Sequence, residues 1–281
     1  MNSADITMRS IIAYEKHLRS QERCEGTVAK YLRDIAAFTG WLGERELNKE
    51  AALEWKRLLA ANGLRPATIN SKLAALNGFF AFCGREDCRI KFLKIQRQTF
   101  RRRDKELTEA EYRRLVNCAY DKGRLRLALL LETLGATGIR VSELKFITVE
   151  AAGFGRTDIA LKGKIRTILL PAKLCRKLLK YARKNKIASG EIFLTGSGRS
   201  LSRKQIWAEM KALCKAAGVS ASKVFPHNLR HMFAAAYYRV SRDIVQLADV
   251  LGHASIETTR IYLLTTGIEH IRRMERLGFV I

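Results

Sequence analysis

Residues 225–231 of this chain read FPHNLRH. Proline suits the first turn of a helix, because that position needs no backbone N–H, so we expect a helix to begin at Pro226. The three-residue spacing then places His227 and Arg230 on one face of that helix. A histidine and an arginine side by side can bind a phosphate group while the histidine moves a proton. Alone, such a pair is more often a surface feature of a capped helix, so it needs partners elsewhere.

A second stretch lies upstream, where residues 136–144 read ATGIRVSEL. Gly138 can end one helix and turn the backbone sharply, which brings Arg140 close to the start of the next helix. There the guanidinium and the free backbone N–H groups can both face an anion. An arginine paired with Glu143 is usually structural, so this stretch alone does not predict a functional site.

A third stretch lies downstream, where residues 251–262 read LGHASIETTRIY. Ser255 can cap a helix, and the pattern predicts that this helix runs as far as Tyr262. His253 lies just before the helix. A tyrosine in such a place is more often half-buried packing, and Tyr237 and Tyr238 are positional rivals for any role in chemistry.

The composition indicates a nucleic acid as the partner. Lys and Arg number 52 against 27 Asp and Glu, which gives a formal net charge of +25 and a pI near 10.2. Such an excess of positive charge is typical of proteins that bind polyanions. The N-terminus lacks the pattern of a signal peptide, and no apolar run is long enough to cross a membrane. We therefore expect a cytoplasmic protein.

The sequence lacks the motifs of common cofactors. A glycine-rich stretch at residues 196–200 has no third glycine where a nucleotide-binding loop requires one, and Gly163-Lys164 does not continue as a phosphate-binding loop. Six scattered cysteines, with no nearby histidine to complete a zinc site, are expected to be buried free thiols. We expect neither a cofactor nor a metal ion.

The chain is expected to form two domains joined by a linker. Apolar residues at three- and four-residue spacing predict helices over Ile6–Arg19, Thr27–Leu42, Lys49–Leu59 and Pro66–Phe82 in a domain of residues 1–95. Residues 96–106 are basic and aperiodic, which predicts a linker that can lie along DNA phosphates through Arg101, Arg102, Arg103 and Lys105.

The second domain is expected to span residues 107–281. Thr108 and Glu111 have the spacing of a capping box, and helices are predicted at about 109–121 and 124–136. Short strands are predicted at Ile159–Leu161 and Thr167–Leu170, on either side of a turn formed by residues 162–164. The rest is mainly helical, so the architecture is mostly α with a small sheet.

Taken in order, Arg140, a lysine in a β-turn, His227-x-x-Arg230, Leu-Gly-His253 and Tyr262 resemble the tyrosine recombinases. This is the family of Xer-type resolvases, Cre and phage integrases. The resemblance is highly specific and runs from about Leu107 to the end, while the N-terminal part resembles the family's core-binding domain more loosely. Residues 225–262 look most like integrases of bacterial mobile elements. The resemblance implies a helical core-binding domain and an α+β catalytic domain that close around double-stranded DNA.

The resemblance also implies a role for each residue. Tyr262 would be the nucleophile, leaving a 3′-phosphotyrosyl bond and a free 5′-hydroxyl. Arg140 and Arg230 would bind the non-bridging oxygens of the phosphate. His227 and His253 would assist by hydrogen bonding and proton transfer, with His227 the base for the tyrosine hydroxyl.

Glu143 would orient Arg140 from behind. The family supplies the proton for the leaving 5′-oxygen from a lysine of the β-turn, and the turn here looks one residue shorter than the frequent form. We favour Lys162, because its Lys-Gly pair matches, while Lys164 is a rival.

The chain end carries a predicted helix at Ile268–Leu277 and an apolar tripeptide, residues 279–281. In the family such a tail often docks on a neighbouring protomer, so we expect a homo-oligomer on DNA, in the form of a tetramer. Two other functions stay open. A type IB topoisomerase uses similar chemistry to relax DNA, and a non-catalytic DNA-binding accessory protein would keep the fold without cutting.

Overall fold

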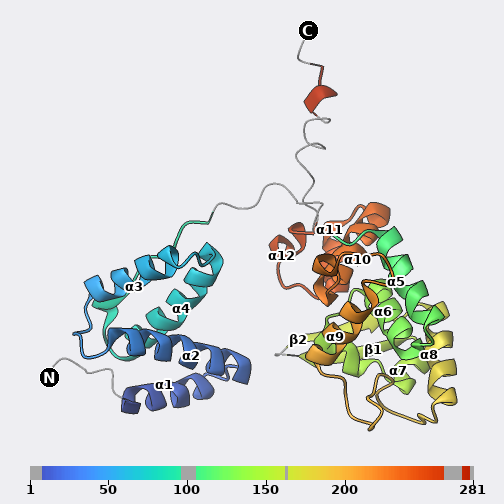
Figure 1. Ribbon diagram of the computed structural model, residues 1–281, viewed down its shortest axis with the longest axis horizontal. Helices are drawn as coiled ribbons and strands as arrows, with labels where there is room; N and C mark the ends of the chain where they lie inside the picture. The colour runs from blue at the N-terminus through green and yellow to red at the C-terminus, as the bar shows by residue number, and fades with distance from the viewer. Residues whose placement is uncertain (1–7, 96–105, 162–163, 263–273, 279–281) are drawn as a thin grey trace. The chain divides into compact units, whose positions relative to one another are not determined.

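A computed structural model describes residues 8–95, 106–161, 164–262 and 274–278. The chain divides into two compact units, Met1–Arg97 and Gln98–Ile281, and each is described by itself. In the described residues, the regular elements of the first unit are all helices, and those of the second are helices and one hairpin (Figure 1). The expected fold class, mainly α with a small sheet, is confirmed. The expected linker, residues 96–106, lies outside the described residues except for its last residue.

The first unit is built from four α-helices, as predicted. Their bounds are Met8–Ser20 (α1), Glu25–Leu42 (α2), Lys49–Ala61 (α3) and Pro66–Phe82 (α4), followed by a short 3-10 helix at Glu86–Cys88 (η1). The core between the helices is rich in aromatic side chains, among them Phe38, Phe79 and Phe80. Phe38 and Phe80 meet edge to face at 5.8 Å between ring centroids. Burial of such large apolar rings is the main force that holds a small helical domain together.

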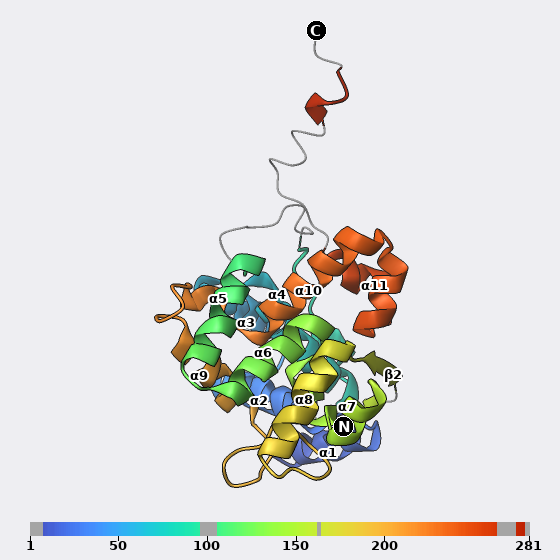
Figure 2. The ribbon, with the colours of Figure 1, turned by 90° about the vertical axis from the view of Figure 1, so that its right-hand side faces the viewer.

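The second unit is organised around α6. Its elements are α5 (Glu109–Asp121), α6 (Leu125–Thr137), η3 (Val141–Phe146), α7 (Val149–Phe154), β1 (Arg156–Leu161), β2 (Lys164–Leu169), α8 (Ala172–Lys184), α9 (Arg203–Leu213), η4 (Ala221–Lys223), α10 (Pro226–Ser241), α11 (Ile244–Leu251) and α12 (Ile256–Arg260). Helix α6 packs against α5, α8 and α10, and Figure 2 shows it crossing the middle of the unit between α5 and α8. A helix that is apolar on nearly all sides needs such a central place.

Strands β1 and β2 pair in antiparallel register from Arg156↔Leu169 to Leu161↔Lys164. The predicted strands, Ile159–Leu161 and Thr167–Leu170, both fall on this hairpin, but each begins three residues too late, and the second also ends one residue too late. Backbone hydrogen bonds continue the ladder through polar residues whose side chains gave no apolar pattern. Lys164, expected in the turn, belongs to β2, and residues 162 and 163 lie outside the described residues.

In the described part of the chain, no helix is long and apolar enough to span a membrane. All six cysteines are free, but only Cys88, Cys175 and Cys214 are buried. The expectation of buried thiols is wrong for Cys24, which is exposed just before α2, where its thiol lies 3.1 Å from the Thr27 hydroxyl.

Candidate active site

The turn at Gly138 determines where Arg140 lies. Helix α6 ends at Thr137, and Gly138 follows in the left-handed region with φ of 62°. A Cβ at this position would lie 2.2 Å from the Phe233 ring of α10, so the close approach of the two helices requires glycine. Arg140 then caps η3. The predicted sharp turn is confirmed, although the helix that follows is a short 3-10 helix.

Gly138→Ala is expected to destabilise the second unit by about 2–4 kcal/mol, because it combines backbone strain with a clash against Phe233. Gly123→Ala is the matched control, since Gly123 has a similar φ of 65° but open space around it. That variant should lose only about 1 kcal/mol from strain alone. Urea unfolding of both variants checks the prediction, and equal losses would show that the contact with Phe233 is unimportant.

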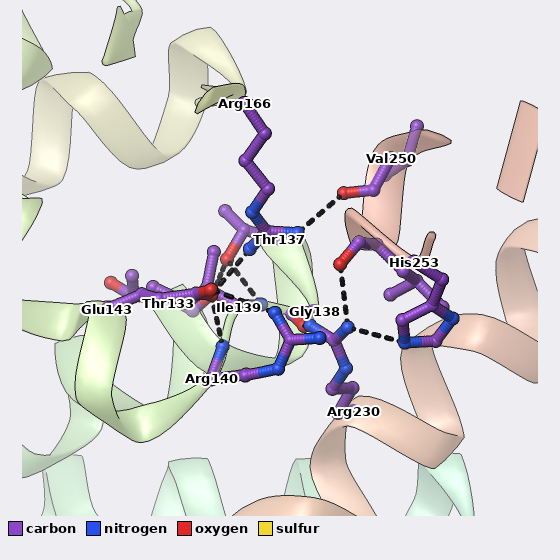
Figure 3. Close-up of polar contacts among 11 residues, drawn as sticks. Thr133, Thr137, Gly138, Ile139, Arg140, Glu143, Arg166, Arg230, Val250 and His253 are labelled. Atoms are coloured by element: carbon purple, nitrogen blue, oxygen red, sulfur yellow. Dashed lines mark hydrogen bonds and ion pairs between the residues drawn. The ribbon is translucent and has the colours of Figure 1, made fainter. Parts of the chain in front are cut away.

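Glu143 joins two arginines at the start of η3. Its Oε1 lies 3.0 Å from Arg140 Nη1, and its Oε2 accepts from the Arg140 backbone N–H at 2.7 Å. The same Oε2 contacts Nη2 of Arg166, from β2, at 2.5 Å (Figure 3). The Glu143 side chain is 3% exposed, whereas that of Arg140 is 44% exposed. One buried carboxylate therefore fixes an arginine whose outer face is open to a ligand.

Arg230 is the most deeply placed cation of the group. It is 3% exposed, and its guanidinium donates to the carbonyl oxygens of Gly138 at 2.6 Å and Leu251 at 2.7 Å. Burial, and then the charge of Arg140, lower the pKa of Arg230 to about 10, so the group stays charged at neutral pH. Arg230 thus ties the end of α6 to the end of α11.

His253 follows the left-handed Gly252 at the end of α11. Its Nε2 lies 2.9 Å from Nη2 of Arg230, and its Nδ1 lies 2.8 Å from the hydroxyl of the buried Thr259. Because an arginine can only donate, Nε2 is the acceptor, and Nδ1–H donates to Thr259. Burial, followed by the charges of Arg230 and Arg140, lowers the pKa of His253 to about 4. The ring is neutral at pH 7.

The titration of His253 gives a direct check. A pKa below the ordinary value of 6.5 means that the folded chain stabilises the neutral ring. The stability that this provides is complete above pH 6.5 and is lost as the pH falls towards 4. We expect the ring resonance that is missing from a His253→Gln spectrum to titrate near pH 4 by NMR. A midpoint at 6 or above would contradict the described environment.

Tyr262 is 3% exposed and packs with Ala234, Leu247 and Leu251 of α10 and α11. Its ring stacks on that of His253, with centroids 5.7 Å apart and an angle of 10° between planes. A hydrogen bond with the Tyr262 side chain also counteracts the lowering of the pKa of Arg230.

The position of Tyr262 in its helix differs from the prediction. Helix α12 ends at Arg260, and the Tyr262 N–H bonds to Thr259 O at 3.0 Å in a tighter turn. The prediction that the helix runs to Tyr262 is therefore wrong by two residues. The Tyr262 ring lies against the rings of three histidines, and such contacts with distant segments cannot be read from local spacing.

Two residues near this group were missed by the sequence analysis. His231 meets the Tyr262 ring edge to face at 4.3 Å and the His227 ring at 4.8 Å. Its position directly after Arg230 was the only available clue. Arg166 contacts Glu143 and the Val250 carbonyl, and no local sequence pattern predicts these contacts.

His227 stands at the first turn of α10, with its ring centroid 6.0 Å from that of Tyr262. Partial shielding from water, then the charges of Arg230 and Arg140, lower the pKa of His227. A lowered pKa keeps the ring neutral at pH 7, and the neutral ring is the form that can accept a proton.

The rival tyrosines have other surroundings. Tyr237 donates to the Gln246 side chain at 3.0 Å, on the side of α10 that faces α11. Tyr237 and Tyr238 pack, partly buried, against the small apolar cluster of α10 and α11.

A cavity of about 570 Å³ opens beside the group. Arg140, His227 and Arg230 line one part of it, and Arg203, Lys204 and Trp207 of α9 line another. Five of these six side chains are basic and suit an anion, and Trp207 offers an exposed aromatic surface. Among the described residues no group of three or more His, Cys, Asp or Glu side chains could hold a metal ion.

Several expected residues lie outside the described part of the chain. These are Lys162 and the linker residues Arg101, Arg102, Arg103 and Lys105. The backbone of Lys164 lies in β2, but the placement of its side chain is not described. The structure brings together the other six, which are Arg140, Glu143, His227, Arg230, His253 and Tyr262.

Comparison with known proteins places both units in one family. The model of the phage integrase family matches residues 105–266, and that of the SAM-like N-terminal domain of phage integrases matches residues 11–87. Tyrosine recombinase XerA of Pyrococcus furiosus is 30% identical, over 98% of this chain and 96% of its own. Tyrosine recombinase XerD of Brucella suis is 32% identical, over 92% and 94%.

The fold also matches a solved structure. A crystal structure of a lambda integrase tetramer bound to a Holliday junction has a TM-score of 0.73 to this chain. The match covers 92% of this chain and 78% of that one, with 19% identity. At this level of identity the likeness concerns the fold alone.

Proposed function

The chain belongs to the phage integrase family of tyrosine recombinases, and from this premise we propose that it cleaves and rejoins DNA at specific sites through Tyr262. One observation carries the proposal: the ring of buried Tyr262 lies beside those of His227 and His253, and Arg230, which bonds to the Tyr262 side chain, also feels the charge of Arg140. These groups come from four separate elements. Structural packing alone would not require so many uncompensated cations at one tyrosine.

The charge of the site fits a phosphate. Arg140 and Arg166 both pair with the carboxylate of Glu143, whereas Arg230 donates to neutral groups. Three positive charges therefore meet one negative charge, which leaves two uncompensated among these described groups. A phosphodiester carries one negative charge, and its charge increases in the transition state of exchange. The surplus therefore stabilises the transition state more than the ground state, which is the condition for catalysis. In this proposal Arg140 and Arg230 bind the non-bridging oxygens.

The proposed cleavage forms a bond between Tyr262 Oη and phosphorus and breaks the bond from phosphorus to the 5′-oxygen. His227 takes the phenolic proton, because its lowered pKa keeps it neutral and ready to accept. The 5′-oxygen takes a proton from a lysine of the hairpin, for which Lys162 is the first candidate and Lys164 the second. The product is a 3′-phosphotyrosyl bond and a free 5′-hydroxyl.

The reverse reaction uses the same groups. The 5′-hydroxyl of a DNA strand attacks the phosphotyrosine, and the proton returns to Tyr262. One phosphate ester is exchanged for another, so the reaction is nearly neutral in energy and requires no ATP. His253 accepts a hydrogen bond from Arg230 and so holds that guanidinium in place.

We also propose that the chain acts on double-stranded DNA as a tetramer. Support comes from the net charge of +25 and from the lambda integrase tetramer bound to a Holliday junction, which has the same fold. In the proposal, residues 1–95 bind the core of the DNA site, the linker at 96–106 follows its phosphates, and residues 107–281 catalyse. The tail after Tyr262 would dock on a neighbouring protomer.

The biological task that we propose is integration of a mobile element, because residues 225–262 resemble such integrases. The relatives above bear the names XerA and XerD, so the task needs its own test. Mapping cleavage on DNA that flanks the encoding gene provides it. If cleavage maps to both ends of a mobile element, integration is supported. If it maps to a single chromosomal site at which dimers of the replicon would be resolved, integration is contradicted.

The experiment that tests the function is covalent trapping on nicked duplexes made from that flanking DNA. A nick beside the cleavage site lets the short 5′-hydroxyl strand escape, so a covalent adduct accumulates. We expect an adduct that survives denaturation. An accessory protein without activity would give none, and a type IB topoisomerase would also relax plasmids that lack any specific site.

A further inference from the structure

We infer that Arg166 is a positioning residue for strand cleavage, which acts on the scissile phosphate through Glu143 and Arg140. The inference rests on the proposed function. Arg166 is 23 residues from Glu143 and 84 from Val250 in sequence, yet its guanidinium contacts both (Figure 3). Arg166 lies on β2, whereas the two arginines proposed to bind the phosphate lie at the start of η3 (Arg140) and on α10 (Arg230).

The contact with Glu143 controls the orientation of the carboxylate. Arg166 Nη2 holds Oε2 at 2.5 Å, and Oε1 is then turned towards Arg140 Nη1 at 3.0 Å. The Arg166 side chain is 12% exposed, so water is a weak competitor for this bond. With Arg166 in place, Glu143 has little freedom to rotate, and Arg140 is fixed in turn.

The other terminal nitrogen of the Arg166 guanidinium bonds to the end of α11. Nη1 donates to the Val250 carbonyl at 3.1 Å, next to the Leu251 carbonyl that accepts from Arg230. Gly252 lies against the Arg166 stem, since a Cβ there would be 2.3 Å from Arg166 Cδ. Arg166 therefore bridges the segment that carries Arg140 and the segment that holds Arg230.

Arg166 also affects charge at the phosphate. If Arg166 were absent, the negative charge of Glu143 would be directed entirely to Arg140, and the site would lose one uncompensated positive charge. The consequence is specific: loss of Arg166 should matter when the scissile phosphate is charged, and much less when it is neutral. A purely structural residue would affect both substrates equally.

The test compares two nicked duplexes that differ only at the mapped cleavage position. One carries a phosphodiester there, and the other a methylphosphonate, in which a methyl group replaces a charged oxygen. We expect Arg166→Met to slow adduct formation about 10- to 100-fold on the phosphodiester, as loss of hydrogen bonds between charged groups would, and at most about 3-fold on the methylphosphonate.

Arg126→Met is the matched control. Arg126 likewise donates to a carbonyl, that of Leu194, and to a carboxylate, that of Glu209, both at 2.6 Å, but it does not line the site. Any loss from Arg126→Met should be the same on both duplexes. Arg166→Lys keeps the charge and can reach only one of the two acceptors, so Glu143 and Arg140 are held less firmly against the charged oxygen. It should show a smaller loss that is still larger on the phosphodiester than on the methylphosphonate.

The outcomes distinguish a failure of the proposed function from a failure of the positioning role of Arg166. If the natural chain forms no adduct on either duplex, the proposed function fails and the inference fails with it. If the natural chain reacts but Arg166→Met loses the same factor on both duplexes, as Arg126→Met would, only the inference is overturned. If Arg166→Met does not fold, the same comparison is made with Arg166→Lys, and an equal loss on both duplexes again overturns it.

Discussion

Tyr262→Phe is expected to abolish the covalent adduct with nicked DNA, a loss on the order of 10⁴-fold or more, because the attacking oxygen itself is removed. Phenylalanine keeps the ring that stacks on His253 and fills the cluster of α10 and α11. The fold and the binding of DNA should therefore persist. Denaturing gel electrophoresis measures the adduct, and a mobility shift with the same duplex measures binding.

Tyr237→Phe and Tyr238→Phe are the controls. Both tyrosines lie on α10 and pack against the same apolar cluster as Tyr262, but Tyr237 bonds to Gln246 rather than to an arginine. Both variants should form adduct at the rate of the natural chain within about threefold, as expected for residues that do not take part in the chemistry. An adduct that survives in Tyr262→Phe and disappears in either control would move the nucleophile to α10.

Arg230→Lys is expected to slow cleavage about 10²- to 10³-fold, the usual result of removing one preorganised donor from a developing negative charge. Lysine keeps the positive charge but not the planar fork that now reaches Gly138 O, Leu251 O and His253 Nε2. Affinity for uncleaved DNA should change less than about tenfold, because the lost interaction strengthens only in the transition state.

Arg239→Lys serves as the control for Arg230→Lys. Arg239 is on the same helix, but it is exposed and pairs with Glu109 at 3.1 Å. Its replacement should leave the cleavage rate nearly unchanged. Single-turnover rates and equilibrium binding, measured side by side, check both variants. A loss of affinity as large as the loss of rate in Arg230→Lys would show that Arg230 binds DNA without helping its cleavage.

Much of the fold could be predicted because its causes are local. The pattern of Pro66–Phe82 gave the bounds of α4 without error, and the Thr108 capping box, which the structure contains, gave the start of α5. The Gly138 turn and the helix start at Pro226 were predicted for the same reason. In each case the residue type itself limits the backbone.

The parts that were missed depend on contacts between distant segments. Arg166 acquires its partners only when β2 lies beside α11, and His231 contacts Tyr262 only because α10 and the end of α12 meet. The early end of α12 has the same origin. Sequence order suggested which residues share a site, but the sharing of Glu143 between two arginines is a property of the folded chain.

The central claim is that the hydroxyl oxygen of Tyr262 becomes covalently bonded to the DNA, and mass spectrometry of the trapped adduct tests it most directly. Trypsin cleaves after Arg260 and Arg272, so Tyr262 lies in the peptide of residues 261–272. After nuclease digestion we expect that peptide to gain the mass of a nucleotide 3′-phosphate, with fragment ions that place it on Tyr262. The nucleotide on a peptide with Tyr237 or Tyr238, or on any other residue, would contradict the account.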